Sequence, residues 1–432
     1  MQNNSRRRYD RRGSLMIPLS FTQECLLDTI PKDSMHDAGH TITEIIPMTE
    51  RYDETTFFSA VGNVIDRHSA LRFTLQKVDG EVYNKILPTA HSDAIHVLVC
   101  KQAEITLQAI NDLIGGGAFE LYDRPLAKFY AILTNKNWFI LITTHHCISD
   151  GRSMEIIYSE ILESYQSLIR NEPPIFPIPH QFDRHIISAH ERYSRGYLDG
   201  DIDHWSTILE RCNKPRNRGS TSRHGTVHVR TASLTGEPHI AALKAARSMR
   251  VSFFCFFAHS FAVALSKLLS GTPSAIETTF SGRWNEEMET CVGYFSHNAI
   301  IATDFLQKDA KHSQIAALSQ QLLESLSAQE MPVGYLFVKR KLATGISFPS
   351  RDFRIKLQMQ NFKKNSPPGK IPSIKDETVE TSISSARALR FFLVPYENGI
   401  GFRLEYRSDL LTPVDINQLL ALISAELAAT GA

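Results

Sequence analysis

Two adjacent histidines, His145 and His146, stand just before the pair Asp150 and Gly151 in the stretch TTHHCISDG. An imidazole has an ordinary pKa of about 6.5, so a histidine here can take a proton from a nucleophile near neutral pH. Aspartate can fix neighbouring groups through charge-assisted hydrogen bonds, and glycine permits a tight turn. The pattern is compatible with a general base, a metal site or an ordinary strand end, and the string alone does not choose among them.

The geometry of a strand narrows these alternatives. Neighbouring side chains on a strand point to opposite faces, so His145 and His146 cannot both line one site, and we expect one catalytic histidine. Adjacent histidines rarely chelate one ion, and no HExxH motif or carboxylate pair stands beside them. We therefore predict that no metal is bound.

The flanking sequence predicts the elements that position this stretch. Residues 126–146 are typical of a hairpin that turns at Asn135–Asn137, and its second strand is apolar on both faces, like a strand in the middle of a sheet. After Gly151, apolar residues recur with helical spacing over residues 153–169. The histidine stretch should therefore lie on a strand-to-helix turn.

The rest of the first half alternates between helical and strand patterns. A helix is predicted over residues 53–68, and two strands over residues 70–87 around the turn Asp79–Gly80. This mixture predicts an α/β (α+β) fold. The prolines of residues 171–182 cannot continue a helix and indicate an extended connector, where we place the boundary between two lobes.

A chain of 432 residues is long for one hydrophobic core, so we expect two domains, residues 14–175 and 176–432. In the second, residues 251–271 indicate a buried helix and residues 386–411 a hairpin, followed by a closing helix from Pro413. The polar segments that separate these elements, residues 213–225 and 363–378, are predicted to be loops.

Composition excludes several classes of protein. The formal net charge is +1, with 42% hydrophobic and 22% charged residues, which indicates a globular protein without a general affinity for nucleic acid. The basic stretch RRRYDRRG near the start is interpreted as a solvated tail. The sequence has no membrane-spanning run and no secretion signal, and a cytoplasmic location is expected. Scattered cysteines argue against a disulfide scaffold or structural zinc. They are Cys25, Cys100, Cys147, Cys212, Cys255 and Cys291.

The stretch HHCISDG resembles the HHxxxDG signature of the condensation-domain superfamily of nonribosomal peptide synthetases, which is related to chloramphenicol acetyltransferase and carrier-dependent acyltransferases. Six other stretches resemble family motifs in the expected order, and the resemblance spans residues 14–425. They are PLSFTQECLL from Pro18, RHSALRFTL from Arg67, FELYDRPLAKFYAI from Phe119, FDRHIISAHERYSRGYLDGDIDHW from Phe182, FSGRWNEEMETCVGYFSHN from Phe280, and EYRSDLL from Glu405.

The departures from the family pattern are also informative. The sequence has no DFGWG motif of the plant-type acyltransferases, and it keeps histidines where heterocyclisation domains carry aspartates. The family often reads GxFVN where this chain has GYFSHN, and its sixth motif is weak at AQEMPVGY. No adenylation or carrier segment is attached, so a free-standing enzyme is expected.

The resemblance implies two chloramphenicol-acetyltransferase-like lobes in a V, with the active site in a tunnel at their junction. It implies that His146 faces the tunnel as the catalytic base, while His145, Asp150 and Gly151 support the site. Asp150 would pair with Arg283, and the Gly151 amide is a candidate oxyanion donor. Two further residues are expected to line the acceptor side, Ser296 and Asn298.

The implied activity is an acyltransferase that moves an acyl chain from a phosphopantetheine thioester on an acyl or peptidyl carrier protein to an amine or hydroxyl. The acceptor is a small molecule or is itself carrier-bound, no cofactor is bound to the enzyme, and a monomer is expected. Three alternatives stay open: a non-catalytic carrier-binding domain, a coenzyme A-dependent O-acyltransferase, and an epimerase of the same fold.

Three other residues near or after the motif could invite a functional interpretation. We predict that Cys147 is a packing residue and not a nucleophile, because direct transfer needs no covalent enzyme intermediate. His185 and His190 are five residues apart on a predicted helix and therefore lie on different faces. They are interpreted as surface or packing residues.

Overall fold

The chain forms two compact units in the computed structural model, one comprising Met1–Leu198 and Ser281–Ser296, the other Asp199–Phe280 and His297–Ala432. The structure describes residues 8–9, 15–31, 34–37, 39–88, 93–100, 118–212, 226–269, 271–340, 355–360, 379–381 and 387–429. The two predicted polar loops and most of the basic N-terminal stretch lie outside these residues.

The division into units differs from the boundary predicted after residue 175. The helix α5 (Phe182–Ser194) follows the proline-rich connector, yet Phe182 and Ile186 are buried in the core of the first unit. The connector itself is held to that unit, because the Arg67 guanidinium donates a hydrogen bond to the carbonyl of Pro177 at 2.9 Å. The prolines therefore mark an extended segment and not a boundary.

The main sheet of the first unit has the strand order β4-β10-β9-β7. Its strands are β4 (Thr41–Met48), β10 (Trp138–His145), β9 (Ala127–Leu133) and β7 (Ile95–Val99). Strand β10 pairs antiparallel with β4 and β9, and nearly all its residues are buried, which confirms the prediction of a central strand. The β9–β10 hairpin turns at residues 135–137, as predicted.

Two smaller sheets complete the strands of this unit. One has the order β1-β2-β6-β5, and the other pairs β3 with β8. The predicted turn at Asp79–Gly80 joins β5 to β6, and both turn residues have positive φ, of 52° and 81°, as a tight hairpin turn requires. The bounds are β1 (Arg8–Tyr9), β2 (Leu15–Pro18), β6 (Glu81–Ile86), β5 (Phe73–Val78), β3 (His36–Asp37) and β8 (Phe119–Glu120).

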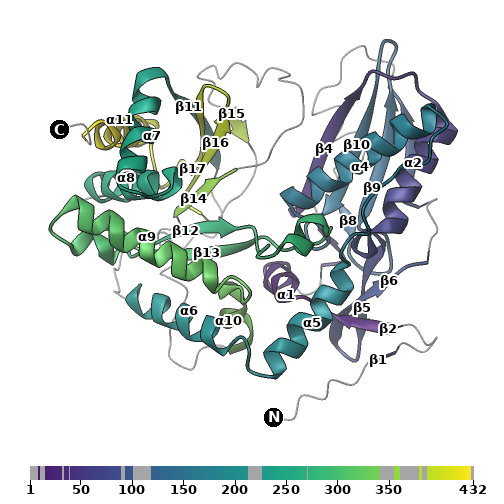
Figure 1. Cartoon of the computed structure of the whole chain (residues 1–432), viewed down its shortest axis with the longest axis horizontal. Helices are drawn as coiled ribbons and strands as arrows, with labels where there is room; N and C mark the ends of the chain where they lie inside the picture. The colour runs from purple at the N-terminus through teal and green to yellow at the C-terminus, as the bar shows by residue number, and fades with distance from the viewer. Residues whose placement is uncertain are drawn as a thin grey trace. The chain divides into compact units, whose positions relative to one another are not determined.

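Helices α2 and α4 contact each other and lie along the main sheet of this unit (Figure 1). Each begins at an aspartate N-cap whose carboxylate accepts from a backbone amide, Asp53 for α2 and Asp150 for α4. The cap explains why α4 starts at Gly151, earlier than the apolar pattern alone indicated. The bounds are α1 (Phe21–Leu27), α2 (Glu54–Arg67) and α4 (Gly151–Ile169), with the 3-10 turns η1 (Ser69–Arg72) and η3 (Glu286–Thr290).

The second unit is built on a seven-stranded sheet of order β13-β12-β14-β16-β17-β11-β15. One face is apolar, with side chains such as Leu357, Phe391 and Leu404 buried in a core that includes the predicted buried helix, α8. The strands are β11 (Val227–Thr235), β12 (Ala275–Phe280), β13 (His297–Ala302), β14 (Ile355–Met359), β15 (Val379–Thr381), β16 (Leu389–Tyr396) and β17 (Gly399–Arg407).

Helices α7, α8 and α11 contact one another and cover this apolar face (Figure 1). The predicted closing helix begins at Pro413, with Thr412 as its N-cap. The bounds are α6 (Asp199–Arg211), α7 (Gly236–Ser248), α8 (Phe253–Leu268), α9 (Lys311–Ser327), α10 (Val333–Arg340) and α11 (Pro413–Ala428), with the 3-10 turn η4 (Asp304–Gln307).

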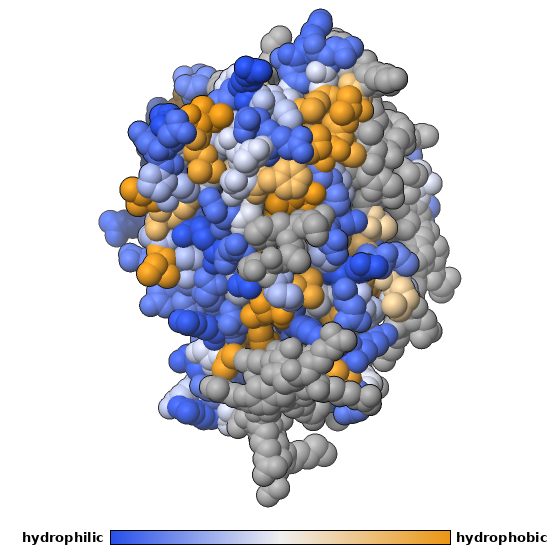
Figure 2. Space-filling model, turned by 90° about the vertical axis from the view of Figure 1, so that its right-hand side faces the viewer, coloured by the Kyte–Doolittle hydropathy of each residue, from blue (hydrophilic) through white to orange (hydrophobic). Residues whose placement is uncertain are grey.

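Hydrophobic residues on the face shown in Figure 2 form several separate areas among hydrophilic ones. Among the described residues, no single helix has the length and apolar character to cross a membrane. One pair, Gly236–Ser248 with Phe253–Leu268, meets those criteria only when its two helices are counted together across a bend of 106°.

The segment Ser281–Ser296, called here the inserted segment, leaves strand β12 of the second unit, belongs to the first unit, and returns as β13. Within it, Gly293 lies directly against the ring of Phe182 in α5. A Cβ atom added at Gly293 would come within 2.6 Å of the ring carbon Cγ, closer than packed atoms approach.

We predict that Gly293→Ala lowers the free energy of unfolding by about 1–3 kcal/mol, because the buried Phe182 ring must shift to make room. Urea denaturation of both proteins measures the difference. Gly200→Ala is the matched control, because a Cβ atom there meets nothing within 4 Å. An unchanged transition for Gly293→Ala would contradict the packing described here.

Candidate active site

The histidine stretch lies on a strand-to-helix turn of the first unit, as predicted. Strand β10 ends at His145, residues 146–148 form the turn, and α4 begins at Gly151. The turn is closed by a hydrogen bond from the amide of Ile148 to the carbonyl of His145 at 3.1 Å. The side chains of His145 and Asp150 are almost completely buried, whereas that of His146 is half-buried.

Asp150 accepts five hydrogen bonds through its two carboxylate oxygens. Oδ1 accepts from the amide and hydroxyl of Ser153 and from Arg283 Nη2, and Oδ2 accepts from the amides of Phe295 and Ser296, all at 2.8–3.1 Å. Burial alone would raise the pKa of Asp150, but the Arg283 guanidinium and these hydrogen bonds hold it below its ordinary value. Asp150 is therefore an anion at neutral pH.

Arg283 ties the inserted segment to this carboxylate. Its Nη2 lies 3.1 Å from Asp150 Oδ1 and donates to the Ser153 hydroxyl at 3.0 Å. Its Nη1 donates to the carbonyls of Met288 and Cys291, both within the inserted segment. The pairing of Arg283 with Asp150 that the resemblance implies is present. The same guanidinium also holds the backbone of the inserted segment.

His146 is held by hydrogen bonds at its backbone and at one ring nitrogen. Its amide donates to the carbonyl of His40 at 2.7 Å, and its Nδ1 lies 2.8 Å from the carbonyl oxygen of Ser149. A carbonyl can only accept, so Nδ1 carries a proton and the neutral ring has its free lone pair on Nε2. The ring also contacts Tyr294, with ring centres 4.6 Å apart.

Burial lowers the pKa of His146 below its ordinary value of 6.5, against the opposing effects of Asp150 and the Ser149 carbonyl. The ring is therefore neutral near pH 7. A half-buried neutral imidazole with an unprotonated Nε2 can accept a proton from a bound nucleophile.

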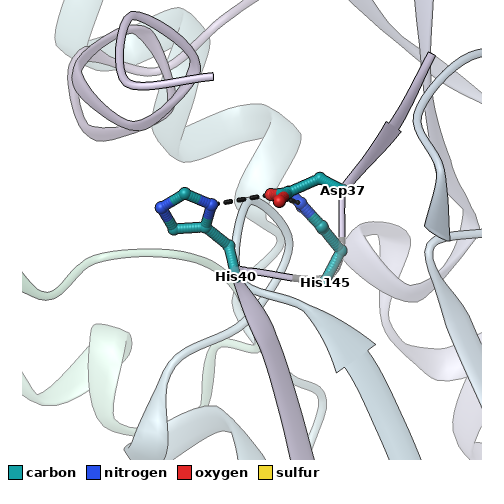
Figure 3. A group of neighbouring side chains, drawn as sticks. All are labelled: Asp37, His40 and His145. Atoms are coloured by element: carbon teal, nitrogen blue, oxygen red, sulfur yellow. Dashed lines mark hydrogen bonds and ion pairs between the residues drawn. The ribbon is translucent and has the colours of Figure 1, made fainter. Parts of the chain in front are cut away.

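The side chain of His145 is fully buried and lies against Asp37, a partner that the motif did not reveal (Figure 3). The amide of Cys147 donates to its Nδ1 at 3.2 Å, so its proton is on Nε2, which lies 3.0 Å from Asp37 Oδ2. The same Asp37 oxygen lies 2.6 Å from His40 Nδ1. Asp37 thus joins the motif to the His40 backbone that holds His146, and no sequence spacing indicated this.

Asp37, His40 and His145 offer three ligand atoms within 4.8 Å of one another, a set that could hold a metal ion. The hydrogen bonds fit such an ion poorly. A metal on His145 Nε2 would move the ring proton to Nδ1, where it would face the amide proton of Cys147. The arrangement favours a carboxylate that orients two imidazoles.

Helix α1, which lies within the stretch PLSFTQECLL, also supports the turn. Gln23 Nε2 donates to the carbonyl of Cys147 at 2.9 Å, and the Thr22 hydroxyl donates to the carbonyl of Tyr294 at 2.6 Å. Gln23 also completes a capping box with Ser20. The stretch from Pro18 therefore positions both the turn and the inserted segment.

The two residues expected on the acceptor side, Ser296 and Asn298, lie in different units. The amide of Ser296 binds Asp150, whereas Asn298 belongs to the second unit, where its side chain accepts from Lys356 at 2.9 Å. Cys147 is buried, and burial raises the pKa of its thiol, so it is not a ready nucleophile.

The two helix histidines are packing residues, one of the two interpretations given above. His185 lies between aromatic rings, and burial lowers its pKa to about 4. His190 Nε2 lies 2.8 Å from the carbonyl of Leu19.

We predict that Asp150→Asn lowers the free energy of unfolding at pH 7 by about 3–5 kcal/mol, because Arg283 is left buried without its counter-charge. Urea denaturation measures this loss. Asp53→Asn is the matched control, since Asp53 is an exposed N-cap and asparagine caps equally well. Wild type loses the contribution of Asp150 as pH falls through its lowered pKa, so the difference should shrink in acid. Equal effects of the two substitutions would contradict the account.

We predict that Asp37→Ala costs about 1–3 kcal/mol, because the buried Nε2 proton of His145 loses its acceptor. Asp37→Asn should cost less, since its amide oxygen can still accept. Thermal and urea unfolding of the pair measure both effects. Asp93→Ala, at an exposed residue whose ion pair with Arg124 is 4.0 Å long, should be nearly neutral. An Asp37→Ala protein as stable as wild type would exclude a supporting role for Asp37.

Comparison with known proteins places this site in a family. The family model described as "Condensation domain" matches residues 14–429. The chain is 22% identical over 425 residues to one of the linear gramicidin synthase proteins of Brevibacillus parabrevis, covering 93% of this chain and 8% of that protein. It is 23% identical over 410 residues to surfactin synthase subunit 2 of Bacillus subtilis, covering 91% of this chain and 11% of that protein. The chain thus spans a small part of these relatives.

Solved structures agree in fold. SgcC5 from Streptomyces globisporus matches with a TM-score of 0.69 at 19% identity, covering 96% of this chain and 98% of that one. The first condensation domain of the calcium-dependent antibiotic synthetase matches with a TM-score of 0.71 at 14% identity, covering 96% of each chain. With a family match that runs through the whole histidine turn and both units, the chain belongs to the condensation-domain family.

Proposed function

We propose that this protein is a condensation-type acyltransferase. It moves an acyl chain from a thioester on the phosphopantetheine arm of an acyl or peptidyl carrier protein to the amine or hydroxyl of an acceptor. Membership of a family that works on carrier-bound substrates in peptide and polyketide synthetases supports this class of reaction. The observation that carries the proposal is the lone pair on His146 Nε2, left free by the bond from Nδ1 to the Ser149 carbonyl.

In this reaction, His146 Nε2 takes the proton of the acceptor as its oxygen or nitrogen attacks the thioester carbonyl. The new C–O or C–N bond forms, the C–S bond breaks, and the proton passes to the leaving thiolate, so that His146 returns to its neutral form. A general base of this kind contributes roughly 10²- to 10⁴-fold to the rate. A hydroxyl depends on it more than an amine, because an alcohol must lose its proton as it attacks.

Gly151 supplies the second element of the mechanism. It is the first residue of α4, and amides in the first turn of a helix have no acceptor within that helix. The positive end of the helix dipole also favours negative charge there. The Gly151 amide is therefore our candidate donor to the oxyanion that forms on the thioester carbonyl. Asp150 takes no part in proton transfer, because both its oxygens are occupied by hydrogen bonds.

The test uses acyl-loaded carrier protein, or acyl-coenzyme A in a parallel reaction, mixed with a pool of amines and alcohols. Intact-mass spectrometry follows loss of the acyl group from the carrier, and small-molecule mass spectrometry finds the product. We expect wild type to form a new amide or ester, and His146→Gln to be slower by roughly 10²- to 10⁴-fold, more so with alcohols. His204→Gln, at a half-buried histidine of the second unit, is the matched control.

The pH profile gives an independent check. The active form of His146 is neutral and its pKa is lowered, so activity should fall in acid at a lower pH than an ordinary histidine would give. Unchanged turnover in folded His146→Gln would exclude this residue as the base. Absence of transfer by wild type from any carrier or coenzyme A donor would point to a non-catalytic carrier-binding domain.

A further inference from the structure

A row of four charged side chains crosses the seven-stranded sheet of the second unit. Glu277 on β12 is in register with Lys356 on β14, Lys356 with Arg390 on β16, and Arg390 with Glu405 on β17. Residues in register on neighbouring strands lie side by side on the same face, about 5 Å apart. Their sequence neighbours Ile276 and Leu357 are buried in the apolar core, so this row, called here the charged row, lies on the opposite face.

Arginines already occupy both carboxylates of the charged row. Arg387 Nε donates to Glu277 Oε2 at 2.7 Å. Arg390 Nη2 lies 2.5 Å from Glu405 Oε2, and Arg403 Nη2 lies 2.9 Å from Glu405 Oε1. Glu405 thus serves two arginines and Glu277 serves one.

Lys356 is not paired with a carboxylate of the described residues. Its ammonium donates to Asn298 Oδ1 at 2.9 Å, and no ion pair joins it to any acidic group in the described part of the chain. Four cationic groups, counting Lys356 with the three arginines, thus share two carboxylates. A charge removed from water without a counter-charge is costly, so the centre of the row favours an anion.

The other free donor lies on the strand beside Lys356. Arg390 Nε is buried and has no hydrogen-bond partner among the described residues. An ammonium has three N–H donors, and Asn298 uses one of those of Lys356. Lys356 and Arg390 therefore offer donors on neighbouring strands, which suits the two oxygens of a carboxylate. A phosphate, with more oxygens and more charge, would need additional donors.

We propose that Lys356 and Arg390 bind the carboxylate of a small molecule. The ligand class is a small carboxylic acid, such as an amino acid or a hydroxy acid. Binding would supply the missing negative charge at the centre of the charged row.

Protonation of Lys356 is coupled to this binding. Burial, then Arg387 and Arg390, lower the pKa of Lys356 to about 7, with Glu277 opposing them. A carboxylate binds the ammonium and not the neutral amine, so affinity should weaken as pH rises from 6 to 8. Glu405 and Arg403, the charged groups beyond Arg390, are paired with each other at 2.9 Å.

Calorimetric titration with 3-hydroxybutyrate, without any acyl donor, tests the proposal on the full chain. We expect wild type to bind it, and Lys356→Gln to bind about tenfold to hundredfold more weakly. Lys356→Arg should retain most of the affinity, and circular dichroism checks the fold of both variants. Lys267→Gln, at an exposed lysine paired with Glu426, is the matched control. The uncharged methyl ester of the same acid should not bind.

Three outcomes would overturn the proposal: no binding of 3-hydroxybutyrate by wild type, equal binding by Lys356→Gln, or tighter binding of inorganic phosphate than of the carboxylate. Failure of the acyltransferase function is separable from these results. His146→Gln should bind 3-hydroxybutyrate normally, so binding without transfer contradicts the enzyme and leaves the site standing. Acyl transfer to neutral acceptors by a protein that does not bind 3-hydroxybutyrate would contradict the carboxylate site and leave the enzyme function standing.

Discussion

The buried carboxylate of Asp150 holds together two parts of the first unit that lie far apart in sequence, the start of helix α4 and the inserted segment. It caps helix α4 through Ser153, pairs with Arg283, and accepts the amides of Phe295 and Ser296. Removing these groups from water is costly, and the cost is met because both carboxylate oxygens have donors. With the helix start and the inserted segment fixed, the three-residue turn that begins with His146 has little freedom left.

This constraint explains how an ordinary histidine becomes a directed base. The turn brings the Ser149 carbonyl to Nδ1, and the inserted segment brings Tyr294 against the ring. Asp37 restrains the turn through its hydrogen bond with His145, and Gln23 restrains it through its hydrogen bond to the Cys147 carbonyl. A base that is already oriented and neutral needs no rearrangement or deprotonation before it can accept a proton from the acceptor. The chemistry of the site is thus largely a consequence of backbone hydrogen bonds.

Local patterns in the sequence were sufficient for the elements around the site. The apolar run of β10, the turn at Asp79–Gly80 and the helix after Gly151 follow from side-chain periodicity and glycine geometry, and the structure contains all three. Contacts between segments that are distant in sequence could not be predicted from such local patterns. Asp37 reaches His145 only because β3 pairs with β8, and Lys356 meets Arg390 only through strand register. The V-shaped arrangement of the lobes and the roles of Ser296 and Asn298 in substrate binding stay predictions.

The most direct test of the account is the protonation state of His146, measured by nitrogen-15 NMR of histidine-labelled protein at pH 7.5, with His146→Gln to assign the signals. We predict a protonated Nδ1 and an unprotonated Nε2, with this preference lost in a folded Arg283→Gln protein. A proton on Nε2, or a doubly protonated ring at that pH, would contradict the claim that the turn presents His146 as a base.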